Sequence, residues 1–382
     1  MAEAVRALTL AELRKRKSVK WRHFPSDVLP LPVAEMDFPT APKIKAALTD
    51  MVERSDTGYL GPFPELFDAF ANFSAKRWGW QVDTKQMRIA TDVGVGIVEI
   101  MRTLIKPGEK VMLNSPVYEN IWRWVSEVHA TTVDTPLSED NLSYKLDLAA
   151  IEKEYQNGVK VHILCHPHNP VGAIFSKDQL SDLADLAKKY QVVILSDEIH
   201  APLTYDAKTF TPFLNVSQNA KVVGITITSA SKSFNLAGLK CAVIITESTK
   251  LQERINVMPP AVTWRASLFG AVASTAAYAE SVDWLDGVLI TLDQNRKLVE
   301  KLIATKAPAI KYRIPDFGYL AWLDLSALGL GEDPSAAILE KGKLAVNGGV
   351  LYGPKHKSFV RLNFGTSPEI ITEAFDRLAN CL

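Results

Sequence analysis

The sequence is poor in the features that define several whole classes of protein. It contains only three cysteines in 382 residues, none close to another, which excludes a disulfide scaffold and favours a reducing compartment. Its 43 basic and 43 acidic residues cancel, which argues against a broad nucleic-acid-binding surface. The longest charge-free apolar stretch, residues 266–279, has 14 residues. A membrane-spanning helix needs roughly 20, so a buried core helix is predicted there.

The N-terminus also lacks the apolar core of an export signal, because charges are spread through residues 1–21. We therefore expect a cytoplasmic protein that binds neither membranes nor nucleic acids. What the sequence does have is a globular composition, 47% hydrophobic and 23% charged. Its length suggests two or three domains.

Short apolar runs alternate with helical patterns through the middle of the chain. The runs predict strands at 87–90, 110–113, 160–165, 192–195, 222–228 and 241–246. Several are β-branched and apolar on both faces, as in strands covered by helices on both sides. One intervening helix is predicted at 177–190, with Ser176 as its N-cap. This alternation predicts an α/β fold with a mostly parallel central sheet and helices on both faces.

The remaining segments suggest how the chain is divided. Residues 1–40 are irregular and rich in proline, and we expect an arm that lies over another surface as part of a small domain. A large cofactor-binding domain is predicted for 41–280, opening with helices at 41–54 and 64–78. An amphipathic stretch at 281–304, a strand pair (319–325 and 359–363) and a terminal helix predict a smaller C-terminal α+β domain, 281–382.

Polar or glycine-rich segments follow five consecutive predicted strands. In open α/β sheets, ligands bind beyond the carboxyl ends of the strands, so these segments should meet in one crevice. They are T-D-V-G-V-G (91–96), N-S-P-V-Y (114–118), H-P-H-N-P-V-G (166–172), S-D-E-I-H (196–200) and S-A-S-K-S-F-N (229–235).

The side chains in these segments suit pyridoxal 5'-phosphate (PLP). Lys232 supplies an amine for the cofactor's aldehyde, and Asp197 a carboxylate that keeps the pyridine nitrogen protonated. Asn169 offers a donor to the phenolic oxygen, and Tyr118 a flat partner for the ring.

The phosphate of PLP also has a predicted place. A helix N-terminus with small residues binds phosphate well, and Gly94 and Val95 open such a helix. Ser229 and a nearby cation would complete the phosphate site.

The same segments resemble a known family. N-P-x-G (169–172), S-D-E-I-H and S-x-S-K-S-F-N resemble the fold-type I PLP enzymes of the aspartate aminotransferase superfamily. V-A-E-M-D-F-P-T-A-P (33–42) and D-E-I-H resemble its MalY/PatB branch, the cystathionine β-lyase type. Further matches are S-P-V-Y (115–118), Y-L-A-W-L-D-L (319–325) and F-V-R-L-N-F-G (359–365), and the resemblance spans about residues 15–380.

The resemblance implies roles for individual residues. Lys232 would hold the cofactor as a Schiff base and act as the proton-transfer base, while Tyr118 would stack on the ring. Arg361 would bind the substrate α-carboxylate through a bidentate pair. Tyr59 would reach the phosphate of the neighbouring subunit's cofactor, so the resemblance implies a homodimer.

Two positions depart from the aminotransferase pattern. His200 stands three residues after Asp197, where many aminotransferases have tyrosine, so its hydrogen bond to the phenolic oxygen is in question. Lys240 stands where arginine is frequent, and it would hold phosphate as a point charge without the forked geometry.

The reaction is left open by these motifs, because the same cofactor machinery serves several outcomes. The resemblance implies β-elimination of L-cysteine S-conjugates such as L-cystathionine, giving a thiol (homocysteine), pyruvate and ammonia. The alternatives are a class I/II aminotransferase and a PLP-binding regulatory protein. No metal site is expected, because Pro167 interrupts the histidines at 162, 166 and 168 and no acidic or cysteine partner has ligand spacing.

Overall fold

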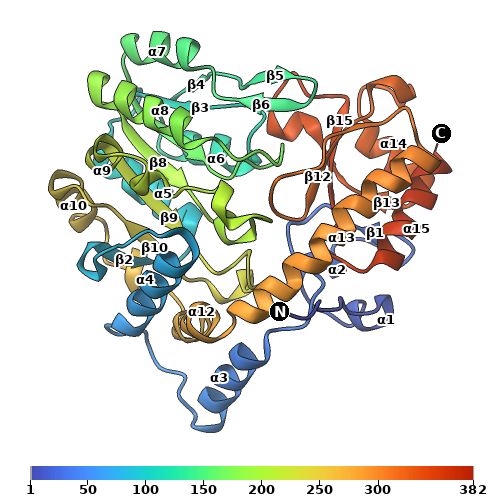
Figure 1. Ribbon diagram of the computed structural model, residues 1–382, viewed down its shortest axis with the longest axis horizontal. Helices are drawn as coiled ribbons and strands as arrows, with labels where there is room; N and C mark the ends of the chain where they lie inside the picture. Colours follow the sequence, from blue (N-terminus) through green and yellow to red (C-terminus); the bar gives the residue numbers. More distant parts are fainter. Residues whose placement is uncertain (1, 382) are drawn as a thin grey trace.

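A seven-stranded sheet forms the centre of the molecule in the computed structural model, which describes residues 2–381 (Figure 1). The strands lie in the order β2 (Met87–Ala90), β10 (Ala242–Ile245), β9 (Gly224–Thr228), β8 (Val193–Asp197), β7 (Val159–Cys165), β3 (Lys110–Leu113) and β4 (Thr131–Asp134). The five strands from β9 to β4 are parallel to one another. Strand β10 is antiparallel to both of its neighbours, β2 and β9.

Alternate residues of these strands bury both faces of the sheet, as strand geometry requires. Ala242 and Ile244 of β10 belong to one apolar cluster, and Val243 and Ile245 belong to the other. The first cluster includes α5 (Val93–Leu104), α6 (Glu119–Glu127), α10 (Thr249–Asn256) and α11 (Ala261–Trp264). The second includes α4 (Pro64–Trp78), α7 (Leu148–Gln156), α8 (Lys177–Tyr190), α9 (Gln218–Val223) and α12 (Leu268–Glu280). The predicted fold class, a fold-type I α/β architecture, is confirmed.

Local sequence signals explain where the helices begin. The Ser176 hydroxyl accepts a hydrogen bond from the Gln179 amide at 3.2 Å, so α8 begins at the predicted cap. The Asp92 carboxylate accepts from the Val95 amide at 2.8 Å and caps α5 in the same way. Helices α3 (Pro42–Glu53) and α4 each begin with a proline, whose missing N–H is unimportant in a first turn.

The C-terminal part of the chain forms a second, four-stranded antiparallel sheet. Its order is β11 (Lys311–Tyr312), β12 (Leu320–Asp324), β15 (Phe359–Asn363) and β14 (Asn347–Gly348). The predicted strand pair is therefore present, with Trp322 opposite Arg361. Helices α13 (Val282–Lys306), α14 (Pro334–Gly342) and α15 (Pro368–Ala379) complete this part, and α13 contacts both α12 and α15.

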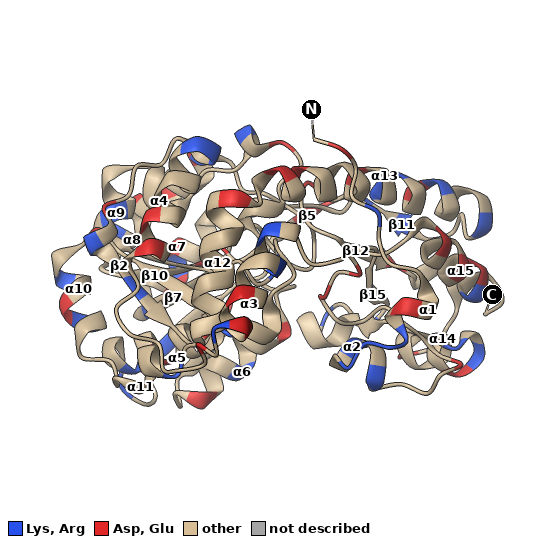
Figure 2. Ribbon diagram, turned by 90° about the horizontal axis from the view of Figure 1, so that it is seen from below, with Lys and Arg blue, Asp and Glu red and all other residues tan. Residues whose placement is uncertain are grey.

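The N-terminal arm packs against this C-terminal part. It holds two short helices, α1 (Leu10–Leu13) and α2 (Val19–Arg22), and the strand β1 (Leu29–Pro30). Strand β1 pairs in parallel with β13 (Leu344–Ala345). Figure 2 shows α1 and α2 on the side of β12, β15 and α14, with basic and acidic residues interspersed over the whole ribbon. The proposed domain limits at residues 40 and 280 stay a prediction.

Several local features differ from the sequence-based expectations, and most predicted strand limits shift by one or two residues. The strand predicted at 222–228 begins at Gly224, because Ser217 caps α9 and the helix takes Val222 and Val223. Strand β4 was not expected, since it is half exposed at the sheet edge. A hairpin of β5 (Ser138–Asp140) and β6 (Ser143–Lys145) was also not expected. Within residues 2–381, none of the helices combines the length and the apolar character required to cross a lipid bilayer.

Candidate active site

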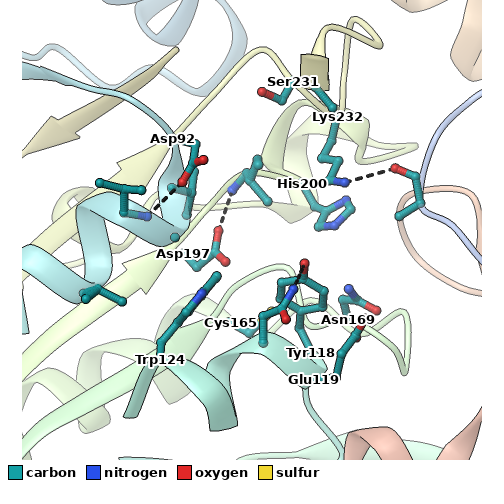
Figure 3. Close-up of a pocket in the computed structure, with 18 of the residues that line it drawn as sticks. Asp92, Tyr118, Glu119, Trp124, Cys165, Asn169, Asp197, His200, Ser231 and Lys232 are labelled. Carbon is teal, nitrogen blue, oxygen red and sulfur yellow. Dashed lines mark hydrogen bonds between the residues drawn. The ribbon is translucent and has the colours of Figure 1, made fainter. Parts of the chain in front are cut away.

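A cleft of about 650 Å³ lies at the carboxyl ends of the parallel strands (Figure 3). The last residues of β7 and β8, Cys165 and Asp197, line it, and so does the start of α5. The cleft brings together nine of the eleven predicted site residues: Gly94, Val95, Tyr118, Asn169, Asp197, His200, Lys232, Lys240 and Arg361. The polar segments that follow the strands therefore do meet, as the fold class predicted.

Lys232 projects into the cleft from the turn after β9. Its Nζ donates a hydrogen bond to the carbonyl of Ala34, in the arm, at 3.0 Å. Burial, aided by the charge of Arg361, lowers the pKa of Lys232 to about 8. A larger fraction of this amine is therefore neutral near pH 7 than for a surface lysine, and the neutral form is the nucleophile and base.

Asp197 ends β8 and is buried. The Ile199 amide donates to its Oδ1 at 3.2 Å. Burial raises the pKa of the Asp197 carboxyl to about 6, although that amide and the charge of Lys232 oppose the rise. A buried carboxylate of this kind is stabilised by a cationic partner, and a protonated pyridine nitrogen is one.

Arg361 and Asn169 come from distant strands and meet in the cleft. One Arg361 amino group donates to Asn169 Oδ1 at 3.1 Å, and the other donates to the carbonyl of Pro32 at 2.9 Å. The Arg361 guanidinium also lies 5.0 Å from the centre of the Tyr352 ring. Its Nε is buried and has no hydrogen-bond partner within residues 2–381. The guanidinium is thus held in place with a donor left for an anion, as a carboxylate-binding group requires.

Tyr118 and His200 supply two rings to the cleft. Tyr118 stands at the cap of α6, and its hydroxyl accepts from the Asn120 amide at 2.5 Å. Burial raises the pKa of Tyr118 to about 12, so the phenol is neutral. His200 is buried with Nδ1 unpartnered among the described residues, and burial lowers its pKa to about 3. A neutral imidazole with an unpartnered nitrogen can donate or accept, depending on its tautomer.

The predicted phosphate end of the cleft is partly occupied by bonds within the protein. The Val95 amide bonds to Asp92, and Lys240 Nζ lies 3.0 Å from the other oxygen of that carboxylate. The Ser229 hydroxyl donates to the Cys241 carbonyl at 2.6 Å. Ser231, rather than Ser229, lines the cleft, and the two hydroxyls lie 2.7 Å apart.

Gly94 has a steric reason to be glycine. A Cβ there would lie 2.9 Å from the indole of Trp124, so this part of the cleft wall accepts only the bare backbone. Trp124 also packs edge-on against Tyr118, with ring centres 5.8 Å apart. Sequence reasoning missed Trp124, because an aromatic residue one turn inside a helix has no local mark of function.

Tyr59 lies apart from the other predicted site residues. It is 94% exposed, in a segment between α3 and α4 that does not line the cleft. Sequence reasoning also missed the carbonyls of Pro32 and Ala34, whose partners lie about 200 to 330 positions away in the chain. Carbonyl groups carry no side-chain signal, so only the fold reveals them.

The three histidines in and after β7 are buried and contact other residues of the protein; His168 lies 3.1 Å from the Cys165 carbonyl and 2.9 Å from the Pro116 carbonyl. His162 bonds to Tyr155 at 2.8 Å and to Asn114 at 2.6 Å. His166 stacks on Phe210, with ring centres 4.8 Å apart. In the part of the chain that the structure describes, no group of three His, Cys, Asp or Glu residues is arranged to hold a metal ion.

Comparison with known proteins places the chain in a family. Residues 26–378 match the family model of class I and II aminotransferases. The chain belongs to this family. It is 35% identical to cystathionine beta-lyase of Corynebacterium glutamicum over 98% of this chain and 99% of that protein. It is 30% identical to cystathionine beta-lyase PatB of Bacillus subtilis, over 96% of this chain and 97% of that one.

Solved structures agree with this assignment. The structure of cystalysin from Treponema denticola, which contains a pyridoxal 5'-phosphate cofactor, superposes with a TM-score of 0.93. The two chains are 26% identical, and the match covers 100% of this chain and 98% of that one. The predicted resemblance to the fold-type I superfamily and its cystathionine β-lyase branch is thereby confirmed.

The cleft fits PLP on its own chemistry. A buried amine with a pKa near 8, a buried carboxylate with a raised pKa and an unpartnered guanidinium Nε lie in one cleft. These groups match the aldehyde and the pyridine nitrogen of PLP and the carboxylate of an amino acid, respectively. None of the three groups bonds to another within residues 2–381, so each can take a partner from a bound cofactor or substrate.

Proposed function

We propose that this protein is a PLP-dependent carbon–sulfur lyase acting on L-cysteine S-conjugates. With L-cystathionine and water as reactants, the products would be homocysteine, pyruvate and ammonia. The buried Lys232, placed in one cleft with Asp197 and Arg361, is the observation that carries the PLP-dependent part of the proposal. When bound, PLP withdraws electrons from the Cα of an amino acid attached to it.

The residues of the chain divide the remaining work. Arg361 binds the substrate α-carboxylate and so orients Cα toward Lys232. Lys232 takes the proton from Cα as its general base, which its lowered pKa favours near neutral pH. Asp197 holds a proton on the pyridine nitrogen. In elimination, the Cβ–S bond breaks and the sulfur leaves as a thiol.

The charges of the cleft favour elimination over transamination of an amino acid whose side chain is a lone carboxylate, as in aspartate or glutamate. Such a substrate needs a second cation for its side-chain carboxylate. The two further cations that line the cleft are already paired, Arg102 with Glu99 and Lys240 with Asp92. The relatives named cystathionine beta-lyase support the same choice.

The test uses PLP-loaded protein with L-cystathionine or S-ethyl-L-cysteine and no keto acid. We expect pyruvate, ammonia and thiol to accumulate in equal amounts. Lys232→Ala should lower the rate by at least about 10³-fold, because it removes the proton-transfer base. Lys221→Ala is the matched control, since that lysine pairs with Glu247 at 2.8 Å and does not line the cleft.

A different result would identify the second candidate. Absence of pyruvate, with amino transfer that appears only on addition of 2-oxoglutarate, would make the protein an aminotransferase and reject the lyase proposal. Retained ligand binding without turnover of any amino acid would favour a PLP-binding regulatory role.

A further inference from the structure

Most of the charged side chains that line the cleft already have an assigned partner. Asp92 pairs with Lys240, and Glu99 pairs with Arg102. Lys232, Asp197 and Arg361 are reserved for the cofactor and the amino-acid substrate. Each of these seven charges is therefore balanced within the cleft or by the ligands it holds.

Two carboxylates remain, Glu119 and Glu127, at opposite ends of α6. Glu127 is exposed, so water solvates its charge. Glu119 is only partly exposed, and its Oε2 is buried with no hydrogen-bond partner within residues 2–381. A buried carboxylate oxygen without a donor is unfavourable, and a bound ligand that brings a donor relieves that penalty.

Glu119 lies close to the reacting part of the cleft. Figure 3 shows it on the same side as Tyr118 and Asn169, with Lys232 on the opposite side. The negative charge of Glu119 adds to the effect of burial in raising the pKa of Tyr118. The same charge raises the pKa of Lys232 and so opposes the effect of burial on that amine. Glu119 therefore lies within electrostatic reach of a substrate held between Arg361 and Lys232.

We propose that Glu119 determines specificity by binding an ammonium group on the leaving half of the substrate. The preferred substrates are then cysteine thioethers or disulfides whose sulfur carries a second amino-bearing chain. Both L-cystathionine and L-cystine meet this description, whereas S-ethyl-L-cysteine does not. The inference rests on the proposed lyase function and specifies its substrate class.

An ammonium group matches Glu119 both in charge and in hydrogen bonding. An ammonium brings three N–H donors and a positive charge, so it satisfies the unpartnered oxygen and offsets the surplus negative charge together. A leaving group with a carboxylate but no amine would face Glu119 with like charge, because no unpaired cation lining the cleft among the described residues remains to receive it. A neutral alkyl group would leave the carboxylate unpaired.

Two analogues of L-cystathionine separate the charges. S-(3-aminopropyl)-L-cysteine keeps the distal ammonium and lacks the distal carboxylate. S-(3-carboxypropyl)-L-cysteine keeps the carboxylate and lacks the ammonium. We would measure kcat/KM for both with the PLP-loaded enzyme, and the dissociation constant of each from the change in cofactor absorbance on binding.

We expect the aminopropyl compound to be preferred by about 10- to 100-fold, the range of a charge-assisted hydrogen bond. Glu119→Gln, which keeps the shape and removes the charge, should reduce that preference to below about threefold. Glu119→Asp should retain part of it. Glu127→Gln removes the same charge from the other end of α6 and should leave the preference intact.

Equal use of both analogues by the wild type, or an unchanged preference in Glu119→Gln, would overturn the inference. The dissociation constants keep this test separate from the proposed reaction. If no compound is cleaved but the aminopropyl analogue binds more tightly through Glu119, the lyase proposal fails and the ammonium site stands. Thermal unfolding of each variant checks that loss of an acidic residue from the first turn of α6 has not disturbed the helix.

Discussion

Asp197 shows how a single buried residue links cofactor binding to stability. In the cofactor-free protein, burial raises the pKa of Asp197 to about 6, above the 3.8 of an exposed aspartate, although the charge of Lys232 partly opposes the rise. The fold therefore disfavours the ionised form that the cofactor needs. In the proposed site, a bound pyridinium would supply the missing positive charge, so the buried carboxyl would destabilise the cofactor-free protein more than the loaded one.

Replacing Asp197 with asparagine should separate these two effects. In cofactor-free wild type, the folded state binds more protons than the unfolded state between about pH 4 and 6, so this residue's stabilising contribution is lost as the pH rises through 6. Relative to Asp197→Asn, the wild type should lose up to about 3 kcal/mol of unfolding free energy across that window. Urea unfolding of both cofactor-free proteins at pH 4, 5, 6 and 7 measures the difference.

With PLP bound, the Asp197→Asn variant should be less active than the wild type by about 10²-fold or more, because asparagine cannot hold the pyridine proton. A pH-independent stability difference would show that the Asp197 carboxyl is not the titrating group. Full activity of the Asp197→Asn variant would show that Asp197 does not bind the cofactor.

Sequence and structure agree best where a residue's role follows from its chemistry and local context. Lys232, Asp197 and Asn169 end or follow strands of a parallel sheet, so the topology alone brings them to one cleft. The choice between Ser229 and Ser231 was not accessible in this way. It depends on a hydrogen bond from the Ser229 hydroxyl to the Cys241 carbonyl, which joins the residue after β9 to the residue before the neighbouring strand β10.

Among the elements, the N-terminal arm has the largest effect on the cleft. The carbonyl of Ala34 accepts from both Lys232 and the Tyr319 hydroxyl, and Asn235 bonds to both the amide and the carbonyl of Met36. The sequence suggested an arm over another surface, but not these contacts. They join residues about 200 or more positions apart, beyond the reach of any local pattern.

A buried ion pair lies within this arm and joins two of its segments. Lys20 and Asp37 are both fully buried and lie 2.7 Å apart, and the Trp21 indole donates to Asp37 at 2.9 Å. Lys20→Met should destabilise the protein by about 3–5 kcal/mol, because it leaves a buried carboxylate without its main partner. The double variant Lys20→Met/Asp37→Leu should recover most of that loss, since neither charge is then left alone.

Urea unfolding of the two single variants and the double variant completes this cycle. Lys43→Met is a control of the same chemistry at an exposed pair, with Glu280 at 3.8 Å, and should change stability by less than about 1 kcal/mol. Additive single effects, with no recovery in the double variant, would mean that the pair does not act as a unit.

Strands were predicted correctly where the local sequence has a clear apolar pattern. Prediction failed where the rest of the sheet determines whether a strand forms or which way it runs. Strands β2 and β3 were predicted to the residue, since each is a short, mostly apolar run next to polar residues. The antiparallel direction of β10 is a property of its connections rather than of its residues. Strand β4 lies at an edge with exposed threonines, so it shows no buried pattern at all.

For the molecule as a whole, the exposed apolar residues suggest that one chain is incomplete. Tyr59 is 94% exposed, Trp264 73% and Val257 70%. Trp264 ends α11, which contacts α5, the helix whose first turn lines the cleft. We propose that a second copy of the chain covers this side and brings its Tyr59 to the phosphate end of the cleft.

Mixing two inactive variants tests that arrangement. If Tyr59 serves the partner's site, a dimer of Tyr59→Ala with Lys232→Ala contains one site with both native residues and one with neither. Random reassembly after co-refolding should then restore about one quarter of the wild-type activity, because half the dimers are mixed and each has one native site of two. Sedimentation should give twice the 42.2 kDa of the chain. Activity no greater than the sum of the separate variants would place Tyr59 outside the neighbouring site, and a monomer in solution would reject the dimer.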